Sequence, residues 1–263
     1  MIGAILPASA AKLSTEQMAA AVQTESVTIP TPGEFFAAID KMGRPNWTQA
    51  GRSQVNGEAS NRPQIALNLG SLVADGYLAV EAHDSQGVKN IGRDIVQLAK
   101  KLNVSESVLA RGNSINDFAE NNDWNALKEE LEATQNEVKL TLRDQKDDDL
   151  VILVSLGAWL RGIQASTQLI AKNYSPSSSK LFRQPAVAEY LVTQVDALPE
   201  RIRGDELVAK VRGQLGQVKD IINVPLDQQL TGEQIAELNQ TVSQAIEEIS
   251  GKPVVLPAPA PTP

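Results

Sequence analysis

The sequence of 263 residues has no cysteine, a single histidine and only 4% aromatic residues. The absence of cysteine excludes disulfide bonds, thiol catalysis and thiolate metal sites. One histidine without other suitably spaced ligands is weak support for a metal centre, and no motif indicates a cofactor, so we expect neither. Because aromatic side chains are scarce, Leu, Val, Ile and Ala must form the core, and this composition suits helices packed against helices.

Positive charge and long apolar runs are also in short supply. The chain has 24 Lys and Arg residues against 32 Asp and Glu residues, a formal net charge of −8. Nucleic-acid-binding proteins need a basic footprint, so we expect no nucleic-acid partner. The longest nearly uninterrupted apolar run, Leu150 to Leu160, has eleven positions. A membrane span needs ~20, so this run is predicted to belong to a buried core helix and not to a transmembrane segment.

Motifs of known catalytic sites are missing. The sequence contains no Gly-x-Ser-x-Gly, phosphate loop, dinucleotide fingerprint or His-Glu-x-x-His pattern, so we predict that the protein is not an enzyme. His83, between Glu81 and Asp84, is a weak candidate for metal binding. Asp84 is better explained as the N-cap of the next helix, with His83 near the C-terminal end of the preceding one. Catalysis by His83 with dispersed carboxylates is the alternative.

The two ends of the sequence differ from its middle. The start, MIGAILPASAAKLS, has the pattern of the end of a secretory signal, with Ala8-Ser9-Ala10 as the small-residue cleavage pattern. We predict that residues 1–26 retain part of an export signal, which would make the protein exported and periplasmic. An ordinary apolar N-terminus on a cytoplasmic protein is the alternative. Residues 251–263 are Pro-rich and are predicted to form a disordered tail.

Helical periodicity covers most of the sequence between these ends. We predict an all-α fold, an up-and-down bundle of about eight helices with flexible N- and C-terminal ends. The bundle forms a single domain over residues 27–250, with a possible internal boundary near 173–180. The helices at 63–82 and 150–172 are the most apolar, so they are predicted to be the central pair.

Residues 43–63 are polar, rich in glycine and almost without periodicity. Loops of this length inside a compact domain are often functional. Trp47 stands alone in the loop, and we predict that it pins the loop to the body of the protein, since lone aromatic residues mostly serve packing. This loop, or an exposed helix face, is the expected interaction surface.

The two central helices share a short sequence pattern. LGSLVADGYLAV begins at Leu69 and LGAWLRGIQAS begins at Leu156, and with a one-residue gap Asp75 aligns with Arg161. Each very apolar helix therefore carries one charge beside a glycine, which permits a close approach of the backbones. The match is too short to establish an internal duplication.

Three explanations of these two charges stay open. The one that we favour is a buried ion pair between Asp75 and Arg161 that sets the register of the helices, since buried charges usually occur in pairs. In the second, the two polar stripes face solvent separately. In the third, Asp75, Arg161, Trp159 and Tyr77 form a binding site for an anionic small molecule.

For function, we predict a non-enzymatic, exported helical protein that acts as a binding or structural module. Its partner is an unknown protein or a small molecule. The alternative is a protein that binds a small anionic ligand between the two central helices, around Asp75 and Arg161. The first hypothesis predicts no deep polar pocket, whereas the second predicts a pocket at this pair.

Overall fold

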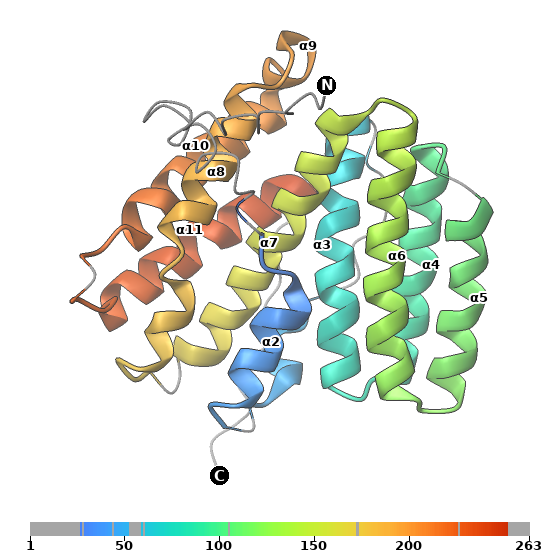
Figure 1. Ribbon diagram of the computed structural model, residues 1–263. Helices are drawn as coiled ribbons and strands as arrows, with labels where there is room; N and C mark the ends of the chain where they lie inside the picture. Colours follow the sequence, from blue (N-terminus) through green and yellow to red (C-terminus); the bar gives the residue numbers. More distant parts are fainter. Residues whose placement is uncertain are drawn as a thin grey trace, which may run out of the picture.

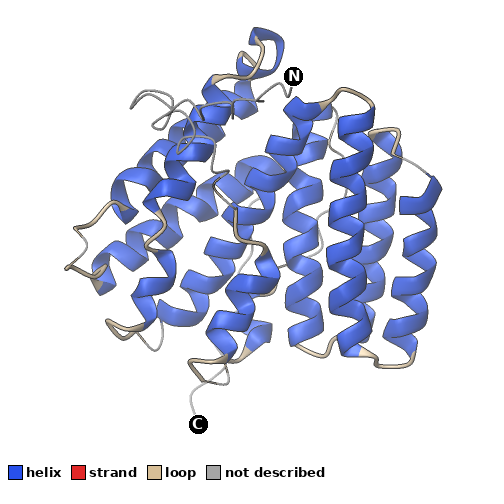
Figure 2. Ribbon diagram, viewed as in Figure 1, coloured by secondary structure: helices blue, strands red, loops and turns tan. Residues whose placement is uncertain are grey.

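The computed structural model describes residues 27, 29–43, 45–52, 59, 61–104, 106–171, 174–225 and 227–251. Over these residues the chain forms ten α-helices and two 3₁₀-helices and contains no strand (Figure 2). The predicted all-α fold is therefore confirmed. The proposed export segment, residues 1–26, and all but the first residue of the tail at 251–263 lie outside the described residues.

Eight of the helices correspond to the eight predicted between residues 63 and 250. The early helix α2 begins where the pattern Thr31-Pro32-Gly33-Glu34 predicts a helix start, so this prediction is also confirmed. The four-residue helix α9 carries no periodic apolar pattern and was not predicted. The elements are α2 (Pro32–Asp40), η1 (Trp47–Ala50), α3 (Arg62–Glu81), α4 (Ser85–Lys101), α5 (Glu106–Glu120), α6 (Trp124–Asp144), α7 (Asp148–Ala171), η2 (Ser178–Phe182), α8 (Pro185–Asp196), α9 (Glu200–Arg203), α10 (Glu206–Ile222) and α11 (Gly232–Ser250).

The helices form two groups on either side of α7 (Figure 1). In one group α3, α4, α5 and α6 pack in order, and α6 returns to α3. In the other group α8 packs on α10, α10 packs on α11, and α11 returns to α7. The contact between α3 and α7 is the most extensive of all helix–helix contacts and joins the two groups. The predicted central pair is therefore confirmed.

Side-chain caps set the starts of several helices. Thr31 and Thr231 each form a capping box with the residue three positions later. Asp84 accepts a hydrogen bond from the backbone N–H of Gly87, and Asp123 caps α6 in the same way. Such a cap contributes about 1 kcal/mol to the stability of a helix. The cap predicted at Asp84 is confirmed, and it places the start of α4 beside the end of α3.

Helix α7 is buried on nearly all sides. Among the described residues it is the one helix long and apolar enough to cross a membrane, but 94% of its apolar window is buried inside the protein. A helix that is apolar all round belongs either in a core or in a bilayer. Here α3, α11, α2 and α6 cover it, so α7 is the core helix of this fold.

Two glycines allow α3 and α7 to touch at their backbones. A Cβ atom on Gly70 would lie 1.9 Å from the carbonyl oxygen of Val154, and one on Gly157 would lie 2.0 Å from the carbonyl oxygen of Leu67. Each glycine therefore meets the residue three positions before the other glycine. This reciprocal contact relates the two Leu-Gly sequences of the shared pattern by a local twofold symmetry.

The two helices run parallel from this contact. Near the start of α3, Arg62 forms an ion pair with Asp147, the residue before α7. Further along, Asp75 of α3 meets Arg161 of α7. The two pairs are separated by 13 residues on α3 and by 14 residues along α7, so both helices advance together.

We expect Gly70→Ala and Gly157→Ala each to destabilise the protein by about 3 kcal/mol or more, since the added methyl group would overlap a backbone carbonyl that cannot move aside. The matched control is Gly213→Ala on α10, because a Cβ atom there has nothing within 4 Å. This control should stabilise the protein by ~0.5–1 kcal/mol. Urea unfolding monitored by circular dichroism measures all three, and similar values for the three variants would contradict the close contact.

Candidate functional site

Asp75 lies where α3, α7 and the segment after η1 meet, and two arginines bind its carboxylate. Arg161 Nε donates to Oδ1 at 2.7 Å, and Arg52 Nε donates to Oδ2 at 2.8 Å. Arg52 Nη2 lies 2.6 Å from Oδ2 and also donates to Ser71 Oγ at 2.6 Å. None of the three charged side chains is more than 9% exposed. The predicted buried pair is confirmed, and Arg52 is an additional member.

Arg161 is enclosed by acceptors of the protein. Its Nη1 donates to Gln164 Oε1 at 3.0 Å, and its Nη2 donates to the carbonyl oxygen of Ala50 at 2.6 Å. Together with the bond from Nε to Asp75, each of its three nitrogens has a partner. Gln164 in turn donates to Ser243 Oγ of α11 at 3.1 Å. Arg161 thereby links η1, α3 and, through Gln164, α11 to the core helix.

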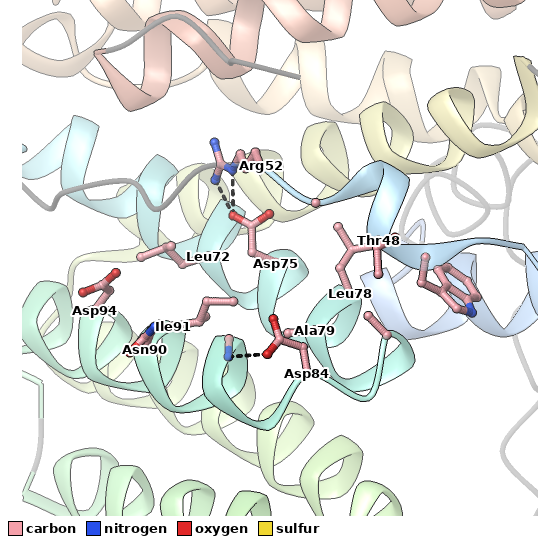
Figure 3. A pocket seen from close by; sticks show the side chains of 14 residues that line it. Thr48, Arg52, Leu72, Asp75, Leu78, Ala79, Asp84, Asn90, Ile91 and Asp94 are labelled. Atoms are coloured by element: carbon pink, nitrogen blue, oxygen red, sulfur yellow. Dashed lines mark hydrogen bonds and ion pairs between the residues drawn. The ribbon is translucent and has the colours of Figure 1, made fainter. Parts of the chain in front are cut away.

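Arg52 is held less completely than Arg161. Two of its nitrogens face Asp75 (Figure 3), while Nη1 is buried and has no hydrogen-bond partner within the part of the chain that the structure describes. Leaving such a donor unpaired costs of the order of 1–3 kcal/mol. Arg52 therefore keeps one unmet donor, although two of its nitrogens contact Asp75 and its side chain is only 4% exposed.

The protonation states follow from burial and charge. Burial alone raises the pKa of Asp75, but the charges and hydrogen bonds of Arg52 and Arg161 outweigh it, so the pKa lies below its usual value of 3.8. Burial lowers the pKa of Arg161, and the charge of Asp75 opposes that effect. A guanidinium stays protonated in proteins. The cluster is thus one carboxylate between two guanidinium ions, with a formal charge of +1.

Trp159 and Tyr77, the other two residues of the predicted binding site, do not reach this cluster. Trp159 is fully buried, and its Nε1 donates to Gln184 Oε1 at 3.3 Å. The Tyr77 hydroxyl donates to the carbonyl oxygen of Lys128 at 3.4 Å. Each lies two positions along a helix from a charged residue, and residues two apart on a helix do not share a face. The helical spacing alone therefore separates them from the Asp75 carboxylate.

A cavity of about 300 Å³ lies beside Asp75, between α3, α4 and residues 47–52 (Figure 3). This volume is at the lower end of the range for small-molecule sites. Arg161 is not among the lining residues. The polar lining is Thr48, Arg52, Asp75, Asp84, Asn90 and Asp94, and the apolar lining is Trp47, Leu72, Leu78, Ala79, Ala82 and Ile91, with Gly51 and Gly87.

The segment that closes the cavity is anchored at both ends. Trp47 is buried, and its ring contacts Phe36 edge-on with 5.5 Å between the ring centroids. The predicted role of Trp47 as a packing anchor is confirmed. At the other end, Arg52 binds Asp75 and Ser71. Part of the loop predicted as an interaction surface thus forms one wall of a cavity that opens to the surface, where Thr48 and Asp84 are exposed.

Sequence reasoning missed Arg52, Asn90 and Asp94. Arg52 precedes Asp75 by 23 residues and lies in a stretch with no periodicity, so no spacing rule connects the two. Asn90 and Asp94 are four residues apart on α4, and the sequence analysis did not single them out. A signal was nevertheless present, because Asp94 lies three residues after Ile91 and four before Leu98, at the helical spacing of the apolar stripe of α4.

His83 lies outside the cavity. It is exposed, has a positive φ of 55° and stacks on Trp124 with 4.7 Å between the ring centroids. Over the described residues, no three His, Asp or Glu side chains lie close enough to hold a metal ion together. His83 therefore lies just after the C-terminal end of α3, where the sequence analysis placed it.

Comparison with known proteins adds no functional residue. No protein-family model matches the chain, and no curated protein or solved structure is significantly similar to it. The geometry of the charged cluster and the cavity therefore carries the functional argument.

We expect Asp75→Leu to destabilise the protein most, Arg161→Met less, and Arg52→Met least. Loss of Asp75 leaves two buried guanidinium ions without a counter-charge, and breaking a buried pair costs ~3–5 kcal/mol. Loss of either arginine leaves Asp75 paired with the other. Loss of Arg161 is expected to cost more because it also removes the donors to Gln164 Oε1 and to the carbonyl oxygen of Ala50. In addition, Arg161→Met should be far less harmful in an Asp75→Leu background than alone. Urea unfolding of the single and double variants measures this, and additive effects would refute the coupling. Arg201→Met, at an exposed pair with Asp149, is the control, with less than ~1 kcal/mol expected.

The cluster also predicts a pH dependence of stability. Because the folded-state pKa of Asp75 lies below 3.8, the ion pairs contribute their full stability above the unfolded-state pKa and lose it as the pH falls through the folded-state value. The difference in unfolding free energy between the wild type and Asp75→Asn should therefore be constant near neutral pH and shrink below about pH 4. A difference that stays unchanged in acid would show that Asp75 is not stabilised as a carboxylate.

Proposed function

We propose that this protein is a non-enzymatic binding protein that holds a small molecule in the cavity beside Asp75. The observation that carries the proposal is the position of the cavity: its wall includes two members of a buried, hydrogen-bonded ion cluster. Buried charges of this kind are held in place by their partners and present a rigid surface to a ligand. Apolar side chains with a few placed polar groups are the usual lining of a small-molecule site.

The exposed surface of the described residues supports a small ligand more than a docked protein. Their large exposed hydrophobic side chains are Met42, Leu140 and Tyr174, and these belong to three separate parts of the chain. A surface that binds another protein through apolar contacts would show a contiguous patch. The proposal therefore places binding in the cavity and not on a helix face.

An anionic ligand held by Arg161 is not part of this proposal. Each nitrogen of Arg161 already donates to a protein acceptor. The cavity lining contains three aspartates and one arginine, and with Arg161 bound to Asp75 the formal charge around the cavity is −1. Such a lining repels anions. Neutral and cationic ligands are compatible with it.

Export to the periplasm is a separate part of the proposal, and Ala8-Ser9-Ala10 supports it. A periplasmic binding role and a cavity for a small molecule are mutually consistent. Fractionation of cells that produce the full chain tests the location. Protein confined to the cytoplasm would remove export and leave the cavity proposal intact.

The ligand proposal predicts a rise in thermal stability when the correct small molecule is added. A ligand present at a hundredfold its dissociation constant stabilises the folded state by ~2.7 kcal/mol, which shifts the melting midpoint measurably. The panel should contain amines, guanidines, polyols, sugars, carboxylates and phosphates.

The control for this experiment fills the cavity. Ala79→Leu adds volume to a lining residue of α3, and Ala209→Leu adds the same volume to an exposed position on α10. A stabilising ligand should lose its effect in the first variant and keep it in the second. No shift with any class of ligand, or an equal shift in both variants, would contradict binding in the cavity.

A further inference from the structure

The cavity changes in character between its mouth and its interior. It opens to the surface beside Thr48 and Asp84, which are exposed, whereas the side chains of Arg52, Asp75 and Asp94 in its lining are buried (Figure 3). A molecule that enters therefore leaves water and meets buried charged groups. The hydrogen bonds that these groups still lack decide which molecule the interior favours.

Arg52 is the lining residue with an unmet hydrogen-bonding capacity. Its Nε and Nη2 point to Asp75, and Nη2 also donates to Ser71 (Figure 3). Its Nη1 is buried and has no acceptor among the residues that the structure describes. Because the side chain is only 4% exposed, bulk water does not supply that acceptor. An acceptor brought to a buried, charged donor forms a stronger hydrogen bond than one between neutral groups.

The carboxylates of the lining are already engaged within the protein. Asp75 is bound by two guanidinium ions, Asp84 caps α4, and Asp94 has an interaction inside the fold. None of these groups is therefore assigned to the ligand. The polar contact that the cavity offers is the unpaired donor of Arg52.

We propose that the cavity binds a neutral molecule with an apolar body and a carbonyl oxygen, and that this oxygen accepts a hydrogen bond from Arg52 Nη1. This inference rests on the proposed function and names its ligand class. An ammonium group does not fit at this point, because the guanidinium repels it and it brings no acceptor. A carboxylate would accept, but it meets a formal charge of −1 around the cavity. A hydroxyl group adds a donor that needs a partner of its own.

The rest of the lining suits an apolar body. Leu72, Leu78, Ala79, Ile91 and Trp47 line the cavity with hydrocarbon or aromatic surface. An apolar cavity of about 150 Å³ holds one benzene ring, so a cavity of about 300 Å³ accommodates a ring together with its carbonyl group. Apolar walls with one or a few placed polar groups give a ligand both affinity and a fixed orientation.

NMR titration of the ¹⁵N-labelled full chain with four one-ring probes tests the inference. The probes are acetophenone, α-methylstyrene (in which a methylene group replaces the carbonyl oxygen), benzylamine and benzoate. Acetophenone should bind roughly tenfold or more tightly than α-methylstyrene, since only the ketone accepts a hydrogen bond from the guanidinium. Equal affinities of these two probes, or tighter binding of either charged probe, would overturn the assignment.

Two variants of Arg52 locate the contact. Arg52→Met removes the donor, and Arg52→Lys keeps a positive charge beside Asp75 but lacks Nη1. Each should lower the affinity for acetophenone roughly tenfold and leave that for α-methylstyrene unchanged, whereas a general loss of packing would lower both. Melting curves confirm that the variants fold. Arg201→Met is the matched control, since Arg201 forms an exposed pair with Asp149 and does not line the cavity. A preference for the ketone that persists in both Arg52 variants would refute the assignment.

The two proposals fail in different ways. If another ligand of the thermal-shift panel stabilises the wild type and loses its effect in Ala79→Leu, while acetophenone shows no preference over α-methylstyrene, the binding function stands and the carbonyl assignment is wrong. If neither acetophenone nor any class of the panel binds, both are wrong.

Discussion

The close approach of α3 and α7 is the constraint on which the rest of the structure depends. Gly70 and Gly157 bring the two backbones together at one point, where even a methyl group would overlap a carbonyl oxygen. Asp75 follows Gly70 by five residues and Arg161 follows Gly157 by four. Within these one to two turns the parallel helices α3 and α7 enclose both charged side chains. Asp75 and Arg161 are buried because of this packing, and their pairing is the way in which the chain accommodates two charges inside its core.

Burying such a cluster requires more than the two opposite charges. Removing ions from water costs several kcal/mol for each ion, and the attraction between them offsets this only when the remaining donors and acceptors are also satisfied. The carbonyl oxygen of Ala50, the side chain of Gln164 and the hydroxyl of Ser71 supply these partners. This requirement explains why Ala50 and the side chain of Arg52, in a segment with no helical pattern in the sequence, are buried against α3 and α7, while Thr48 of the same segment is exposed.

Most of the fold could be predicted from the sequence because periodic apolar residues and capping residues act locally. The stripe on α4 and the caps at Asp84, Asp123 and Thr231 each depend on side chains within a few positions of one another. The pairing of Asp75 with Arg161 was also predictable, since each is the charged residue of a very apolar segment.

The candidate site was less predictable because it is assembled from distant segments. Arg52 reaches Asp75 from a loop, and no local rule sets the path of that loop. Asp94 lines a cavity only because α4 packs against α3 and residues 47–52 close over both. Trp159 and Tyr77 are the opposite case: their spacing of two residues from Arg161 and Asp75 was enough to place them on other faces.

The charges of the cluster tolerate burial only as a set. Asp75 would be costly if unpaired in the core, and two arginines bind it there. Arg161 has a protein acceptor for each of its three nitrogens, whereas Nη1 of Arg52 is buried and has no acceptor among the described residues. Because Arg52 lines the cavity and Arg161 does not, the incompletely satisfied arginine of the cluster is the one at the candidate binding site.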